Sequence, residues 1–71
     1  MIKIGDTIQD TEDGGCYFEG IVKQLKPLKY QVTRVVWNGK IIENDEYIGK
    51  VIGLQWWQCY LLIDGDYKNV L

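Results

Sequence analysis

The chain has 71 residues, of which 46% are hydrophobic and 25% charged, and its formal net charge is −2. This length leaves room for one hydrophobic core, so we predict a single domain over residues 1–71. The acidic balance excludes the strongly basic surface of a general nucleic-acid binder. The sequence begins without a secretory h-region and has no apolar run of the ~20 residues that span a bilayer, so we expect a soluble, cytoplasmic protein.

Short apolar runs separated by turn residues predict an all-β fold, and helix signals are almost absent. The expected strands are Met1–Gln9, Cys16–Leu25, Tyr30–Trp37, one long or two short strands within Tyr47–Ile63, and a short final segment, Tyr67–Leu71. Polar turns are expected between them at Asp10–Gly15, Lys26–Lys29, Glu43–Glu46 and Asp64–Asp66. Five or six short, bent antiparallel strands in so short a chain predict a small β-barrel.

Two positions predict local geometry. Gly20, in the middle of the second expected strand, indicates a bulge or a sharp bend. Asn38-Gly39 predicts a two-residue hairpin loop. That loop implies three facing pairs: Trp37 with Lys40, Val36 with Ile41, and Arg34 with Glu43. The opposite charges of the last pair favour this register.

Three stretches resemble, in order, the first three strands of SH3-like small barrels of the KOW and Tudor kinds. They are IGDTIQD, EGIVKQL and YQVTRVVWNGK, and the resemblance covers roughly residues 3 to 42. The same layout is similar to small proteins of bacteriophages, including cyanophages. The residues that carry it are Gly5, Asp6, Gly20, Ile21, Val22, Trp37 and Gly39. It implies an SH3-like barrel but no activity, and the chain from Tyr47 onward departs from the pattern.

Residues for catalysis or metal binding are scarce. There is no histidine or serine, so a cysteine nucleophile would lack its usual base. Cys16 and Cys59 lie in apolar runs and are predicted to be free thiols in the core. The acidic Asp10, Glu12 and Asp13 are interpreted as a solvated turn. We therefore expect no enzyme, no cofactor and no metal site.

Aromatic residues point instead to binding. Nine aromatic side chains are more than a core of this size needs, and Trp and Tyr anchor many protein interfaces. The sequence predicts a non-enzymatic interaction module that binds a protein partner or a second copy of itself. The predicted contact residues are Trp57, Tyr60, Trp37 and Tyr17. The alternative is that these rings cover the barrel ends with their polar tips in water.

The adjacent Trp56 and Trp57 allow two structural interpretations. In a regular strand, neighbouring side chains point to opposite faces, which leaves Trp57 at a surface or an interface. A bulge at this pair would bury both rings.

Nucleic-acid binding is the alternative function. Lys23, Lys26 and Lys29 gather around one expected turn, and exposed aromatic rings could stack bases. The net negative charge and the single arginine, Arg34, count against this function.

Overall fold

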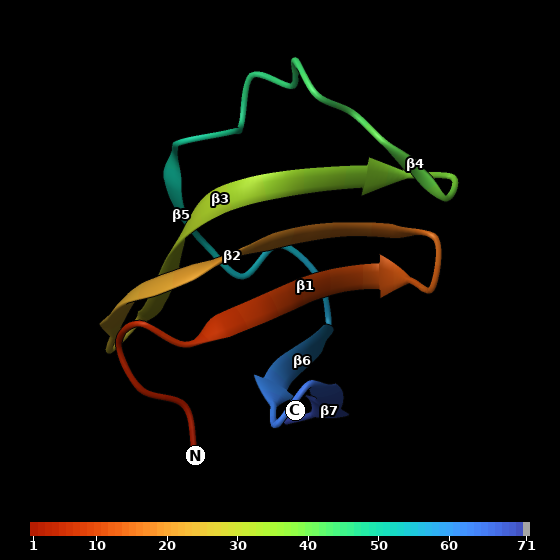
Figure 1. Cartoon of the computed structure of the whole chain (residues 1–71). Helices are drawn as coiled ribbons and strands as arrows, with labels where there is room; N and C mark the ends of the chain where they lie inside the picture. The colour runs from red at the N-terminus through yellow and green to blue at the C-terminus, as the bar shows by residue number, and fades with distance from the viewer. Residues whose placement is uncertain (71) are drawn as a thin grey trace.

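The computed structural model describes residues 1–70, which form one curled antiparallel sheet without a helix (Figure 1). The strands are β1 (Thr7–Asp13), β2 (Cys16–Leu25), β3 (Leu28–Trp37), β4 (Lys40–Ile41), β5 (Val51–Gly53), β6 (Gln58–Ile63) and β7 (Asp66–Asn69). Their order in the sheet is β4-β3-β2-β1-β6-β7, and β5 pairs with β3. The sheet forms a half-barrel, which confirms the all-β fold of short antiparallel strands. Seven strands result because the very short β4 and β5 are separate elements.

The three longest strands, β1 to β3, form the curved centre of the sheet (Figure 1). Both β4 and β5 pair with the edge of β3 that β2 leaves free, whereas β6 pairs with the far edge of β1. The chain must therefore pass from one edge of this centre to the other between β5 and β6. In Figure 1 it runs behind β2 and β1, and residues 54–57 of this crossing belong to no strand.

The core lies on one face of the curled sheet. Its buried cluster consists of Ile8, Phe18, Val22, Tyr30, Val32, Val35, Cys59 and Leu61. Partly buried side chains from the crossing segment and the termini pack against it, among them Leu54 and Trp56. Cys16 and Cys59 are both buried and free, as the sequence predicted.

Gly20 produces the irregularity expected of it, because the register between β2 and β3 shifts between Glu19 and Gly20. A Cβ atom at this position would lie 2.6 Å from Cδ2 of the Tyr30 ring and would overlap the carbonyl oxygen of Gln31. The absence of a side chain at Gly20 is therefore what lets Tyr30 pack close against β2.

The predicted first strand and turn are wrong in position. Gly5 takes a positive φ of 95°, and the sheet begins only at Thr7. The acidic segment expected as a turn is instead the second half of β1, with Asp10 fully buried, and the turn falls at Gly14-Gly15. The cause is tertiary: the Asp10 carboxylate receives buried hydrogen bonds that the local sequence does not reveal.

The Asn38-Gly39 hairpin is confirmed, since both residues have the positive φ values, 51° and 76°, of a type I′ turn. Trp37 faces Lys40 and Val36 faces Ile41, as predicted. The expected pair between Arg34 and Glu43 is wrong, because β4 ends at Ile41. Arg34 lies instead opposite Glu19 of β2, with Nη1 3.9 Å from Oε2.

The region from residue 47 to residue 63 contains two short strands, β5 and β6, which was one of the two expected forms. The final segment is strand from Asp66 to Asn69, and Leu71, at its expected end, lies outside the described residues. Within residues 1–70, no helix is long and apolar enough to cross a membrane.

Candidate functional site

The crossing segment is fixed by one side chain of β1. The Asp10 carboxylate accepts hydrogen bonds from the backbone N–H of Gln55 at 2.6 Å and from that of Trp56 at 3.1 Å. It also accepts the phenolic O–H of Tyr30 at 2.6 Å. Three donors thus satisfy a side chain with 0% exposure, as a buried carboxylate requires.

Burial sets the ionisation of this group. Desolvation raises the pKa of Asp10 above its usual 3.8, although the hydrogen bonds from Tyr30, Gln55 and Trp56 act in the opposite direction. The pKa of Tyr30 is also raised, first by burial and then by the adjacent carboxylate, so its hydroxyl remains a donor. The pKa of the neighbouring Cys59 thiol rises to about 11, first through burial and then through the charge of Asp10.

The crossing segment carries Trp56 to the rim of an open pocket of about 330 Å³. The pocket is lined by Phe18, Val35, Trp37, Ile42, Asp45, Tyr47 and Trp56. Strands β2 and β3 provide its floor, the residues after β4 provide one wall, and the crossing segment provides another. It is therefore a mainly apolar hollow with a single carboxylate, the usual form of a small binding site.

Aromatic rings meet around Phe18 in this pocket. The Phe18 and Trp56 ring centroids are 4.9 Å apart with an interplanar angle of 66°, an edge-to-face contact. The Phe18 and Tyr47 centroids are 5.1 Å apart at 37°. Trp37, 45% exposed, lies at the pocket rim on the end of β3. Phe18 thus contacts two of the other three rings that line the pocket.

The charges near the pocket are mixed, with acidic groups in the majority. Asp45 lines it, and the exposed Glu43 and Glu46 lie within two residues of Asp45 in the sequence. The cations nearby are Lys40, opposite Trp37, and Lys50, whose Nζ lies 5.5 Å from the centroid of the Tyr47 ring. The Lys50 contact is a cation–π interaction with a ring of the pocket lining, whereas Lys50 itself lies outside that lining.

A second hollow, of about 350 Å³, lies between the N-terminal segment and the end of β6. Its lining is Met1, Lys3, Asp6, Leu61, Leu62, Ile63 and Asp64. It contains no aromatic ring and no buried charged group. We therefore take the aromatic pocket as the candidate site.

The four predicted contact residues are not gathered on one surface. Trp37 lines the aromatic pocket. Tyr17 and Tyr60 are half-buried on the opposite face of the sheet, since each alternates with buried core residues of its strand. Trp57 is 67% exposed and lies outside the pocket lining. Of the two interpretations of the Trp pair, the surface position of Trp57 is correct, although the cause is a bend outside any strand.

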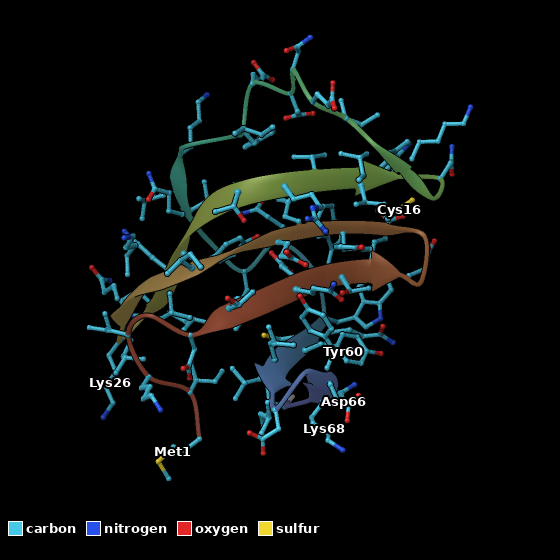
Figure 2. The ribbon with its side chains drawn as sticks, viewed as in Figure 1. Met1, Cys16, Lys26, Tyr60, Asp66 and Lys68 are labelled. Atoms are coloured by element: carbon cyan, nitrogen blue, oxygen red, sulfur yellow. The ribbon has the colours of Figure 1, made fainter. Side chains whose placement is uncertain are left out.

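The three lysines of the alternative function are exposed around the turn between β2 and β3. Lys26, at this turn, and Cys16, at the start of β2, lie at opposite ends of the central sheet (Figure 2). The lysines are therefore far from the aromatic pocket. The nearest aromatic residue in the sequence, Tyr30, is buried and cannot stack a base.

Residues that hold the site together were missed by the sequence reasoning. Asp10 was assigned to a turn, although its alternation with the apolar Ile8 was a signal that both belong to the core face of a strand. Phe18, Tyr47 and Trp56 come from three distant segments, and no local pattern indicates that they meet. Among residues 1–70, no group of three or more acidic or cysteine side chains is placed to hold a metal ion.

Comparison of the chain with protein-family models, with curated proteins and with solved structures gives no match. The site is therefore interpreted from its own geometry.

Proposed function

We propose that this protein is a non-enzymatic interaction module that binds a basic segment of a protein partner at the aromatic pocket. The observation that carries this proposal is the meeting of Phe18, Trp37, Tyr47 and Trp56 around one open hollow. Exposed aromatic pockets are where side chains of a partner anchor most of the binding energy of an interface.

The charge near the pocket favours a basic occupant. Asp45 is the one charged group in the lining, and Glu43 and Glu46 extend the acidic stretch around it. The faces of aromatic rings attract cations, and the Lys50 ammonium already occupies such a position over Tyr47. A lysine or arginine of the partner could place its aliphatic stem against the rings and its charge near Asp45.

A catalytic role has little support. The chain has neither histidine nor serine, and both of its thiols are buried. The raised pKa of Cys59, about 11, keeps that thiol protonated and poorly nucleophilic. Asp10, the one buried carboxylate among residues 1–70, accepts hydrogen bonds from three donors.

We further infer that the half-barrel is a variant of the SH3-like barrel. The first three strands lie next to one another in chain order, which supports this inference. A later strand, β6, pairs with the free edge of β1, which supports it as well. The resemblance of residues 3 to 42 to small phage barrels supports an accessory role in the cytoplasm of a host cell.

The proposal is tested with a pair of tryptophan variants and a defined probe, the peptide acetyl-Gly-Arg-Gly-amide, titrated into ¹⁵N-labelled protein. Trp37→Ala removes a ring from the pocket, whereas Trp57→Ala removes a more exposed ring outside it. We expect wild type and Trp57→Ala to bind the probe equally, and Trp37→Ala to bind about tenfold more weakly. A glutamine peptide of the same design should bind less than the arginine peptide.

Two outcomes would contradict the proposal. One is an absence of shifts at the pocket residues on addition of the arginine peptide. The other is an equal loss of binding in both tryptophan variants.

Nucleic-acid binding through Lys23, Lys26 and Lys29 is the second candidate, supported by their exposure at a single turn. A mobility shift with single-stranded DNA at low salt, lost when all three are changed to glutamine, would favour it. No shift at low salt would eliminate it, since phosphate contacts are strongest under that condition.

A further inference from the structure

One residue, Trp56, both contacts the buried Asp10 carboxyl group and lines the aromatic pocket. Trp56 donates its backbone N–H to Asp10 Oδ1 at 3.1 Å, and its ring forms the pocket wall against Phe18. The preceding N–H, that of Gln55, is held by Asp10 Oδ2 at 2.6 Å. Both bonds join a strand of the central sheet to a segment that belongs to no strand.

We propose that Asp10 is a positioning residue of the pocket: its side-chain carboxyl group holds the backbone of Gln55 and Trp56 so that the Trp56 ring forms the binding wall. This inference rests on the proposed function for the identity of the ligand. The positioning itself is a property of the free protein.

Asp10 faces two titratable groups and one apolar residue. The titratable groups that face it are the Tyr30 phenol from β3 and the Cys59 thiol from β6. From β2 the residue opposite is Phe18, which is apolar. A carboxyl group can accept hydrogen bonds at both oxygens, so it satisfies both backbone donors at once, which a side-chain amide cannot do.

Asp10→Asn tests this requirement with almost no change of shape. Asparagine offers one acceptor and one donor. If its oxygen faces Gln55 and Tyr30, its amino group faces the Trp56 N–H; if it is turned around, the amino group faces the Gln55 N–H. In either orientation one backbone donor meets another donor and the segment must shift.

Tyr30→Phe is the matched variant, because it removes one hydrogen bond from the same carboxylate but leaves both backbone bonds. Each variant is examined free and with acetyl-Gly-Arg-Gly-amide. The readouts are the nuclear Overhauser contacts between the Trp56 indole and the Phe18 ring, and the dissociation constant of the probe. We expect Asp10→Asn to lose these contacts and to bind about tenfold more weakly. Tyr30→Phe should keep the contacts and bind within about twofold of wild type.

The inference is overturned if folded Asp10→Asn retains the indole contacts and the affinity, or if both variants weaken binding equally. If wild type does not bind the probe, the proposed function fails, and the indole contacts of the free variants still decide the role of Asp10. If Asp10→Asn does not fold, wild type is titrated with acid. Acid should then move the amide signals of Gln55 and Trp56. If the contacts between the Trp56 and Phe18 rings are lost in the same pH range, the positioning role of Asp10 is supported. If those contacts are unchanged while the amide signals move, it is refuted.

Discussion

Asp10 and Trp56 are 46 residues apart in the chain, yet the Trp56 N–H donates to the Asp10 carboxylate at 3.1 Å. This bond, with the shorter one from Gln55, connects the middle of the first strand to the segment that crosses the open side of the half-barrel. A carboxyl group with 0% exposure is costly to bury unless it is hydrogen-bonded, and two of the three donors to Asp10 belong to the crossing segment. Here it organises the segment that carries a wall of the pocket.

The Tyr30 hydroxyl is expected to contribute measurably to stability. It is fully buried and donates to Asp10 at 2.6 Å, a hydrogen bond to a charged acceptor. Tyr30→Phe should lower the free energy of unfolding by about 1.5–3 kcal/mol, measured by urea denaturation. The matched control is Tyr67→Phe, whose exposed hydroxyl donates to Glu19 at 2.7 Å and should contribute less than ~1 kcal/mol. Equal losses in the two variants would show that burial does not govern the value of these bonds.

The ionisation of Asp10 predicts a pH dependence with a definite sign. Its pKa is raised above 3.8 in the folded protein, so on folding it takes up a proton at pH values just above 3.8. Its contribution to stability is therefore fully present below pH 3.8 and is lost as the pH rises through the folded pKa. Asp10→Asn lacks this contribution, and the other carboxylates are common to both proteins.

The measurement is the unfolding free energy of wild type minus that of Asp10→Asn, from about pH 3.5 to about pH 7. We expect this difference to fall as the pH rises. A rise would mean that the three hydrogen bonds outweigh desolvation and lower the pKa instead.

The parts of the fold that follow from local chemistry could be predicted from the sequence. Asn38-Gly39 specifies a hairpin because both residues tolerate positive φ. The register shift at Gly20 was expected because a glycine inside a strand often marks an irregularity. Asp10 could not be placed in this way. A run of acidic residues near glycines is typical of a turn, and the donors that keep Asp10 in a strand lie 45 and 46 residues away.

The pocket could not be predicted from the sequence for the same reason. The sequence analysis selected aromatic residues by their number and by strand alternation, and of its four choices only Trp37 lines the pocket. Phe18, Tyr47 and Trp56 meet because the crossing segment brings β5 and β6 to opposite edges of the central strands. Contacts of this kind depend on topology, which local patterns do not encode.

Cys59 is predicted to be unreactive in the native protein. It is fully buried, and burial followed by the charge of Asp10 raises its pKa to about 11, so roughly one thiol in a thousand is ionised at pH 8. Reaction with Ellman's reagent at pH 8 should be slow in buffer and complete for both cysteines in urea. The Cys16→Val variant isolates the signal of Cys59. Rapid labelling of that variant in buffer would mean that the core opens far more readily than its packing indicates.

Gly20 is expected to be the least replaceable glycine of the sheet. A Cβ there would approach Cδ2 of Tyr30 to 2.6 Å and would overlap the backbone oxygen of Gln31, and neither strand can retreat without losing its pairing. Gly20→Ala should therefore lower the unfolding free energy by about 3 kcal/mol or more, measured by urea denaturation. Gly14→Ala is the matched control, since nothing lies within 4 Å of its Cβ position. That variant should stay within ~0.5 kcal/mol of wild type.

Because Gly20→Ala would also displace Tyr30 from Asp10, the Gln55 and Trp56 amide signals should shift in it and remain in place in Gly14→Ala. A stable Gly20→Ala protein with unshifted amides would show that the contact between β2 and Tyr30 is looser than these distances imply.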